Sequence, residues 1–174
     1  AEKADAIELK DVQGKITFKD AEFSYDRKRK ALNGINLEMK AGSRVALIGH
    51  TGSGKTTIAN LICRFYDCTA GEILIDGINI KDVSLTSLRE QISIVLQETF
   101  IFSGTIMDNI RFGNPAATDE EVIAAAKAVG ADDFISRLTK GYETEVEERG
   151  NILSVGERQL LSFSRALLAN PKII

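Results

Sequence analysis

The chain has 174 residues, of which 44% are apolar and 27% charged, and its formal net charge is −3. A chain of this length can bury about 70% of its unfolded surface, so it needs no disulfides or metals to hold a core. The small net charge excludes a general attraction to nucleic acid or membrane surfaces, and the 2 cysteines and 1 histidine are too few for a disulfide framework or a zinc site.

The first half of the chain begins with a polar, weakly patterned stretch, residues 1–13, which we expect to be an arm or linker leading in from an upstream region. Alternating apolar residues then predict half-buried strands. These residues are Ile16 and Phe18, then Phe23 and Tyr25, then Ile35, Leu37 and Met39. The alternation slips by one residue at 19–21, which predicts a bulge. The basic run 26–30 indicates a solvated hairpin turn rather than a nucleic-acid patch.

The next segments predict a buried strand, a helix and a hairpin. Residues 45–48 are a short unbroken apolar run, which is typical of a fully buried parallel strand. A helix follows, with one apolar face. That face consists of Ile58, Leu61, Ile62 and Phe65. Apolar runs at 73–75 and 78–80 flank Asp76-Gly77, a strong hairpin signal, and residues 92–96 predict another buried strand.

The texture changes to helices and loops between about residues 100 and 150, and we expect a helical subdomain there. Thr118 and Glu121 stand three residues apart before an apolar periodic run, which predicts a capping box at the start of a helix. In a capping box the hydroxyl and the carboxylate each satisfy a free backbone amide. Gly130 predicts the end of that helix.

The last predicted helix opens with a second capping box, formed by Ser154 and Glu157, and ends at Asn170-Pro171. We expect it to point four apolar residues inward. These are Leu160, Phe163, Leu167 and Leu168. Residues 172–174 then predict the first step of another buried strand.

A glycine-rich loop carries the clearest chemical signal. Residues 49–56 match G-x-x-x-x-G-K-[ST] between a predicted strand and a predicted helix, the context that a phosphate-binding loop requires. Glycines let backbone amides approach phosphates, and the helix N-terminus adds donors and partial positive charge. The helix dipole contributes only about 0.3–1 kcal/mol, whereas micromolar binding needs about 8 kcal/mol. Amide hydrogen bonds, the Lys55 ammonium, and magnesium held partly by the Thr56 hydroxyl must therefore supply most of the affinity.

We therefore predict a nucleoside triphosphate site in this loop. Its candidate binding residues are Gly49, Thr51, Gly52, Ser53, Gly54, Lys55, Thr56 and Thr57. The side chains of His50 and Thr51 serve as spacers. The alternative is a glycine-rich turn with an accidental lysine, which the combination of motif and context disfavours.

A second motif, residues 153–157, narrows the class of nucleotide-binding protein. A short polar residue and a glycine at the start of a capped helix make another anion-binding helix terminus. Taken alone, this pattern is better explained as a plain helix cap. Its position, about 100 residues after the loop and just before a predicted buried strand, favours a functional role.

With these motifs in this order, the sequence resembles the ATP-binding domain of exporter-type ABC transporters over nearly the whole chain. Residues 49–56 resemble the Walker A loop, and residues 153–159, LSVGERQ, resemble the signature sequence. The resemblance implies an α/β fold over residues 14–174, with a P-loop NTPase core, an antiparallel β subdomain and a helical subdomain, incomplete at the C-terminus.

The resemblance also implies roles for single residues. Tyr25 would stack on adenine, Lys55 and Gln97 would act in catalysis, and Thr56 and Gln97 would contact Mg²⁺. Segments 102–110 and 144–150 are similar to the exporters' segments after the glutamine and before the signature. Some residues differ from those usual in the family. They are Glu147 and Val155 for glycine, Glu157 for glutamine, and Cys68 for proline.

The implied activity is export driven by ATP binding, head-to-tail dimerisation and hydrolysis. One domain's loop would hold ATP against the other's signature residues. Those are Leu153, Ser154, Val155, Gly156 and Glu157. The implied partners are a second ATP-binding domain and transmembrane domains of the same or another chain, without nucleic acid. The implied location is the cytoplasmic face of a membrane, a bacterial inner membrane in particular, with residues 1–13 linking to the membrane region.

Other interpretations stay open at this point. In the family, the strand that begins at residues 172–174 leads to a magnesium-binding aspartate, a catalytic glutamate and later a histidine. Because these lie outside this sequence, we expect weak or no hydrolysis by the chain alone. The alternatives are a soluble P-loop kinase or GTPase, which leaves residues 153–157 without a purpose, and a non-hydrolysing ATP-binding module. The sequence leaves the transported substrate and the choice between homodimer and heterodimer open.

Overall fold

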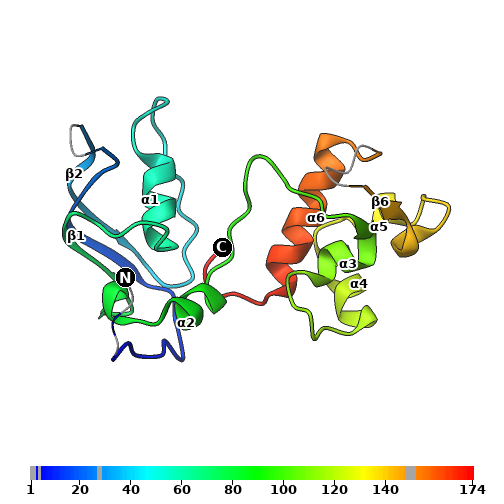
Figure 1. The fold of residues 1–174 in the computed structure, drawn as a ribbon, viewed down its shortest axis with the longest axis horizontal. Coiled ribbons are helices and arrows are strands. Elements are labelled where there is room, and N and C mark those ends of the chain that lie inside the picture. The colour runs from blue at the N-terminus through cyan, green and yellow to red at the C-terminus, as the bar shows by residue number, and fades with distance from the viewer. Residues whose placement is uncertain (1–2, 4, 27–28, 148–151) are drawn as a thin grey trace. The chain divides into compact units, whose positions relative to one another are not determined.

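The computed structural model describes residues 3, 5–26, 29–147 and 152–174. These form two compact units (Figure 1). The first runs to Ile92 and includes Ile173, and the second runs from Ser93 to Lys172 and includes Ile174.

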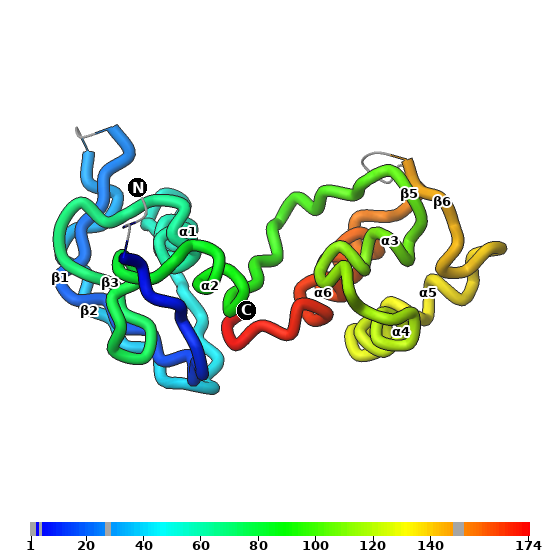
Figure 2. The backbone as a smooth tube through the Cα atoms, turned by 60° about the horizontal axis from the view of Figure 1, so that its bottom comes forward, coloured from blue at the N-terminus to red at the C-terminus, as the bar shows by residue number. Residues whose placement is uncertain are grey.

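The first unit contains an antiparallel sheet in the order β2-β1-β3-β4, visible on the left of Figure 2. Its strands are β1 (Ile16–Ser24), β2 (Lys30–Met39), β3 (Ala70–Ile75) and β4 (Ile78–Asn79). The strands predicted from alternation are therefore confirmed. The bulge is confirmed as well. Asp20 has a left-handed φ of 45°, and at this point the register of β1 shifts against both of its neighbours, β2 and β3. The basic run 26–30 falls between the end of β1 and the first residue of β2, and Arg27 and Lys28 at its centre lie outside the described residues.

The bulge in β1 fits against a glycine in β3. A Cβ atom added at Gly71 would lie 2.2 Å from the carbonyl oxygen of Asp20 and 2.4 Å from that of Lys19. Real Cβ atoms do not approach backbone oxygens so closely, and Gly71 also has a φ of 71°. The position therefore accepts only glycine.

The predicted hairpin is confirmed at Asp76-Gly77, where φ is 51° and 85°. Two consecutive positive φ angles are the requirement of a tight two-residue turn between twisted strands. The Asp76 carboxylate also accepts backbone N–H groups from Gln13 (2.7 Å), Gly14 (3.2 Å) and Lys15 (2.8 Å). The turn thus fixes the chain segment that leads into β1.

The N-terminal segment is better packed than the polar arm that we expected. Leu9 and Val12 are buried in the core of the first unit, and Ile7 forms a parallel bridge to Val83. The two apolar residues were overlooked because charged residues separate them, so no regular period appears. A role for this segment as a linker from a membrane region stays a prediction.

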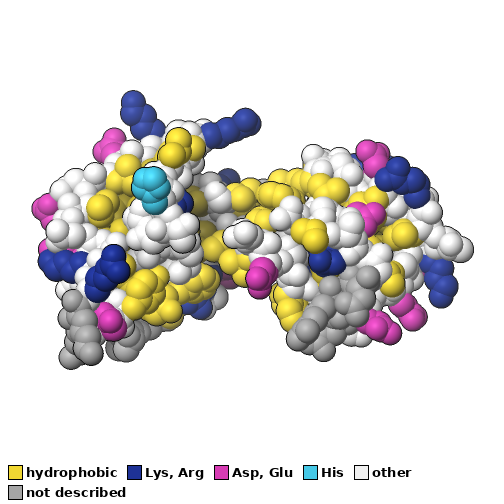
Figure 3. All heavy atoms as spheres, turned by 90° about the horizontal axis from the view of Figure 1, so that it is seen from above, with side chains coloured by type: hydrophobic (Ala, Val, Ile, Leu, Met, Phe, Trp, Pro, Cys, Tyr) yellow, Lys and Arg dark blue, Asp and Glu magenta, His cyan; other side chains and the backbone are white. Residues whose placement is uncertain are grey.

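Two predicted buried strands are wrong in this structure. Residues 45–48 form no strand, and Ile48 is 96% exposed. Of residues 92–96 only Ile92 pairs, through a single parallel bridge to Ile173. A strand exists only when neighbouring strands satisfy its backbone groups, and the sheet of the first unit includes neither segment. Figure 3 shows hydrophobic side chains at the surface of the molecule. The two segments contain several exposed apolar residues, namely Val45, Leu47, Ile48, Ile94 and Leu96.

Three further helical segments complete the first unit. They are α1 (Lys55–Ile62), the short 3₁₀ helix η1 (Ile80–Asp82) and α2 (Leu85–Glu90). The apolar face predicted for α1 is confirmed for Leu61 and Ile62, which are buried. Phe65 lies beyond the end of α1 and is half exposed. The apolar period therefore predicts one helical turn too many, because the chain leaves the helix at Arg64, whose φ is 51°.

The second unit is mainly helical. Its elements are β5 (Gly104–Thr105), α3 (Ile106–Arg111), α4 (Asp119–Ala128), α5 (Asp132–Ile135), η2 (Gly141–Glu143), β6 (Glu145–Val146) and α6 (Val155–Leu168). Strands β5 and β6 pair antiparallel. The capping box of Thr118 and Glu121 at the start of α4 is confirmed, as is the helix end at Gly130, whose φ is 76°. The segment 144–150 lies partly outside the described residues.

Helix α6 begins and ends where predicted but turns a different face inward. Leu161 and Ser164 are fully buried, whereas Phe163 and Leu167 are 45% and 39% exposed. Of the four residues expected to point inward, Leu168 is buried and Leu160 is partly buried. The prediction missed the buried Ser164, whose hydroxyl donates to the Leu160 carbonyl and so needs no water.

Candidate functional site

The glycine-rich loop lies in the first unit and runs directly into α1. Gly52 and Gly54 have φ angles of 82° and 94°, in the left-handed region that favours glycine. Gly54 is also closely packed, because an added Cβ would lie 2.7 Å from Leu32 Cδ2 and 3.0 Å from the Ala31 carbonyl oxygen. A Cβ at Gly52 would meet nothing within 4 Å. The two glycines are therefore required for different reasons.

Gly54→Ala is expected to destabilise the nucleotide-free protein more than Gly52→Ala does. Both changes put an alanine in a left-handed conformation, at a cost of about 1–2 kcal/mol. Only the alanine at 54 must also displace Leu32, and overpacking of this kind costs about 1–3 kcal/mol more. Urea unfolding of both variants measures the difference. Equal losses of stability would contradict the packing described for Gly54.

The Lys55 ammonium sits in the curve of the loop. It donates hydrogen bonds to the carbonyl oxygens of Gly49 (2.7 Å) and His50 (2.8 Å) and to Ser53 Oγ (3.3 Å). All three acceptors are uncharged groups of the loop itself, so none of them neutralises the charge of the lysine. The loop therefore presents the positively charged Lys55 ammonium, which favours the binding of an anion.

The N-terminus of α1 offers backbone donors beside that ammonium. The N-cap is Gly54, no side chain caps the helix, and its first turn contains no acidic residue. The first amides of a helix have no partner within the helix, and they carry its positive dipole end. The first amides of α1 and the Lys55 ammonium, beside the closely packed Gly54, together form a set of hydrogen-bond donors that fits a polyphosphate.

The same donor set is compatible with magnesium. Thr56 is exposed at the start of α1, next to Lys55, while Thr57 is buried. Among the described residues there is no group of three or more His, Cys, Asp or Glu side chains that could hold a metal. Mg²⁺ in nucleotide sites takes few protein ligands and completes its shell with water and phosphate oxygens. One hydroxyl at this position therefore fits the ion.

Tyr25 lies beside the same helix. Its hydroxyl is 3.2 Å from Thr57 Oγ1, and its ring makes edge-to-face contacts with Phe23 (4.7 Å between centroids) and Tyr66 (5.2 Å). Tyr25 nevertheless remains 54% exposed. Contacts with Phe23 and Tyr66 thus fix the accessible ring of Tyr25 beside the helix that follows the loop.

Tyr66 and Thr57 are parts of this arrangement that sequence reasoning did not connect to Tyr25. Thr57 was grouped only with the phosphate loop, and Tyr66 was not singled out. An aromatic residue directly after the apolar face of α1 was the available signal. This signal does not identify the contact between Tyr66 and Tyr25, because that contact depends on the chain around β1 folding against α1.

The signature segment belongs to the second unit and forms the start of α6. The Ser154 amide donates to Glu157 Oε2 (2.7 Å), and the Glu157 amide donates to Ser154 Oγ (3.3 Å). Hydrogen bonds from the Ser154 amide and hydroxyl hold the pKa of Glu157 below its usual range. Leu153 is buried, whereas Val155 is 63% exposed. The capping box thus holds a rigid helix terminus whose first residues are open to solvent.

Gly156 adds to this openness. A Cβ placed there would meet nothing within 4 Å, and its φ is not in the left-handed region. The fold of the described residues therefore does not demand a glycine at this position. A glycine here keeps the surface low, which suits the close approach of another molecule.

Gln97 also lies in the second unit, in an exposed segment without regular structure. The structure thus brings Tyr25, the phosphate loop and α1 together in one unit, and it places Gln97 and the signature residues in the other.

The segment after Gln97 is anchored to α6 by a buried amide and an arginine. Asn109, which is almost fully buried, donates to the carbonyl oxygens of Phe102 and Thr105 (both 2.9 Å). Arg165 of α6 donates to the Phe100 carbonyl at 2.6 Å and to the Asn109 side chain, and its guanidinium lies 5.3 Å from the Phe102 ring centroid. Neither residue was identified as a candidate from the sequence.

Three aromatic side chains, two on this segment and one directly after α3, form an exposed group, which we call the aromatic patch. It consists of Phe100, Phe102 and Phe112, which are 49%, 38% and 62% exposed. Ring centroids are 4.9 Å apart for Phe100 and Phe102 and 4.5 Å apart for Phe102 and Phe112. Large exposed apolar groups in contact with one another mark interaction surfaces.

Comparison with known proteins gives consistent matches. Residues 32–174 match the family described as ABC transporter. The chain is 67% identical over 173 residues to the ABC transporter ATP-binding protein YknV of Bacillus subtilis, and 49% identical over 173 residues to the ATP-dependent lipid A-core flippase of Syntrophus aciditrophicus. Each match covers 99% of this chain and 29% of the relative, so the chain spans less than a third of these proteins.

Among solved structures, a bacterial Atm1-family ABC exporter with ATP bound matches with a TM-score of 0.94 and 47% sequence identity. The match covers 98% of this chain and 30% of that chain. Within the described part of this chain, no helix combines the length and apolar character needed to cross a bilayer.

Proposed function

Because this chain belongs to the ABC transporter family through its ATP-binding domain, we propose that it is part of the motor of an exporter, which binds ATP and drives a substrate across a membrane. The observation that carries this proposal is the phosphate loop itself. There the Lys55 ammonium and the uncapped amides of α1 converge in a curve that requires Gly54. The names of its relatives, a lipid A-core flippase among them, support the link to export.

In the proposed site each group has a defined task. The loop amides and Lys55 bind the phosphate tail, and the ammonium offsets negative charge on the terminal phosphates. Tyr25 provides a ring face for adenine. Thr56 and Gln97 would contact Mg²⁺, which neutralises phosphate charge when bound, and Gln97 would also orient the attacking water. In the complete protein these groups would act in ATP hydrolysis.

A head-to-tail pair of such domains would complete the site. We propose that the exposed end of α6, from Ser154 to Glu157, closes over ATP held by the partner domain's loop. The capping box occupies the amides of Ser154 and Glu157, whereas the two amides between them have no acceptor within the helix, and Gly156 leaves room for the approach. ATP binding would draw the pair together, and hydrolysis would release it.

The aromatic patch supports the proposal that this unit docks against transmembrane segments, at the cytoplasmic face of a membrane. Its three phenylalanines are mutually packed and exposed, while Asn109 and Arg165 fix the backbone that carries Phe100 and Phe102. A rigid apolar surface of this kind can transmit a movement from the motor to an attached helix.

The adenine role of Tyr25 is tested by nucleotide titration. Tyr25→Ala is expected to weaken ATP binding by about 10-fold, because stacking of a base on an aromatic ring contributes about 1–3 kcal/mol. Tyr25→Phe keeps the ring and should stay within about twofold of wild type. Affinity for inorganic tripolyphosphate, which has no base, should be the same in all three proteins. A wild-type preference for GTP over ATP would instead support a GTPase.

Turnover of the full-length protein separates a motor from a binding module. We expect the full-length protein to hydrolyse ATP. Normal ATP affinity without any release of phosphate would support the non-hydrolysing module instead.

A further inference from the structure

Helix α1 ends in an unusual way. The residue after its C-cap, Arg64, has a left-handed φ of 51°. Its amide donates to the Leu61 carbonyl (3.1 Å), and the next amide, of Phe65, donates to the Asn60 carbonyl (2.9 Å). These two hydrogen bonds form a Schellman motif, in which the left-handed residue is usually glycine. An arginine here carries backbone strain that glycine would avoid.

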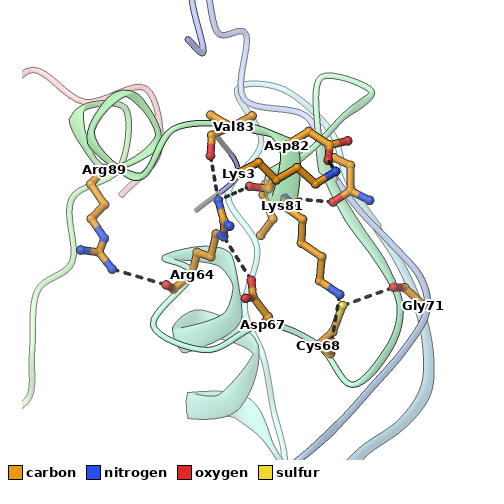
Figure 4. A network of polar contacts seen from close by, with 11 residues as sticks. Lys3, Arg64, Asp67, Cys68, Gly71, Lys81, Asp82, Val83 and Arg89 are labelled. Carbon is orange, nitrogen blue, oxygen red and sulfur yellow. Dashed lines mark hydrogen bonds and ion pairs between the residues drawn. The ribbon is translucent and has the colours of Figure 1, made fainter. Parts of the chain in front are cut away.

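The Arg64 side chain is buried, with only 4% of its surface exposed. Figure 4 shows its guanidinium between α1 and the segment around η1. Nη1 donates to the carbonyl oxygens of Ile80 (2.8 Å) and Val83 (2.7 Å), and Nε donates to Asp67 (3.1 Å). One planar group thus holds the end of the helix, the turn after it and both ends of η1.

Neighbouring contacts reinforce this attachment. Arg89 of α2 donates to the Arg64 carbonyl (3.4 Å), and Lys81 donates to the Cys68 carbonyl (3.0 Å), both drawn in Figure 4. Burying a charge is unfavourable unless it is fully hydrogen-bonded. A strained backbone and a buried cation at one position together indicate that the guanidinium performs a task that glycine could not.

We propose that Arg64 is a positioning residue for the phosphate loop. Helix α1 has eight residues, a length of about 12 Å, with Lys55 at one end and Arg64 directly after the C-cap at the other. By fixing the C-terminal end to η1, Arg64 sets the direction in which the rigid helix delivers Lys55 and Thr56. Charge-assisted hydrogen bonds depend on distance and angle, so a small displacement of Lys55 weakens its contacts with phosphate. This inference rests on the proposed ATP-binding function.

The test uses Arg64→Gly in the full-length protein. Glycine relieves the backbone strain but leaves a cavity lined by the carbonyl oxygens of Ile80 and Val83. We expect the KM for ATP to rise about 10-fold. Guanidinium chloride at about 10 mM, roughly a hundredfold below unfolding concentrations, should restore most of the KM by filling the cavity. Urea at the same concentration, which has the same shape without charge, should not.

Two control variants isolate the guanidinium. Asn170 occupies the same left-handed position after α6 (φ 48°), so Asn170→Gly relieves the same kind of strain and should leave the KM unchanged. Arg64→Lys keeps a charge but not the planar group. It should raise the KM by about threefold without rescue, because its side chain fills the cavity.

The outcomes separate this inference from the proposed function. A wild-type KM in both Arg64 variants would overturn the positioning role. So would a raised KM that guanidinium does not lower in Arg64→Gly, since the residue would then act only through general stability. Retained ATP binding in Lys55→Ala would instead overturn the phosphate site itself, whatever Arg64 does.

Discussion

Lys55→Ala is expected to abolish measurable ATP binding. The ammonium is the one side-chain cation found in the curve of the loop among the described residues, where it lies within 3.3 Å of three loop oxygens. Charge-assisted hydrogen bonds contribute about 1.5–3 kcal/mol, and a loss near the upper end weakens binding about a hundredfold. A micromolar site would then fall outside the range of isothermal titration calorimetry, which is the measurement we propose.

A matched control is available in the same unit. Lys19 is exposed and pairs with Glu72 on the sheet, so Lys19→Ala removes an equal charge away from the loop. It should bind ATP as wild type does. Unchanged calorimetric affinity in Lys55→Ala would mean that the loop does not bind phosphate.

Ser154→Ala in the full-length protein is expected to weaken ATP-driven dimerisation by at least 10-fold while each domain still binds nucleotide normally. The reason is that Ser154 lies at an exposed helix terminus, where its hydroxyl and the nearby amides are proposed to face the partner's ATP. Its loss also removes a helix cap, which costs about 1 kcal/mol of stability. Analytical ultracentrifugation with and without ATP measures the first effect, and urea unfolding measures the second.

The second unit contains the control for this experiment. Thr118 caps α4 through a capping box with the same pattern of hydrogen bonds. Thr118→Ala should lose similar stability and leave dimerisation unchanged. Equal effects of the two variants on dimerisation would mean that Ser154 acts only as a helix cap.

Features set by neighbouring residues were predicted well from the sequence. Both capping boxes, the hairpin at Asp76-Gly77 and the bulge in β1 follow from short-range geometry, and the structure contains all of them. The phosphate loop was equally visible because its glycines, lysine and flanking helix are contiguous in the chain.

Features that depend on distant partners were predicted poorly. An apolar run such as 45–48 indicates only that the segment can be buried. A strand forms only when other segments pair with it. The inward face of α6 was misjudged for a related reason, since a serine can occupy the core when its hydroxyl bonds within its own helix. Tyr66 and Arg64 were missed because their partners come from other elements.

The contact between Gly71 and the bulge in β1 restricts how these two strands can change over evolution. A larger residue at 71 requires the bulge to be removed, and removing the bulge inverts the side chains that follow it in β1, which changes how the chain enters Tyr25 just after the strand. A substitution at 71 alone places its Cβ against the carbonyl oxygens of the bulge. The glycine and the bulge can therefore only be inherited together, and the tyrosine beside the phosphate loop keeps its orientation for as long as they are.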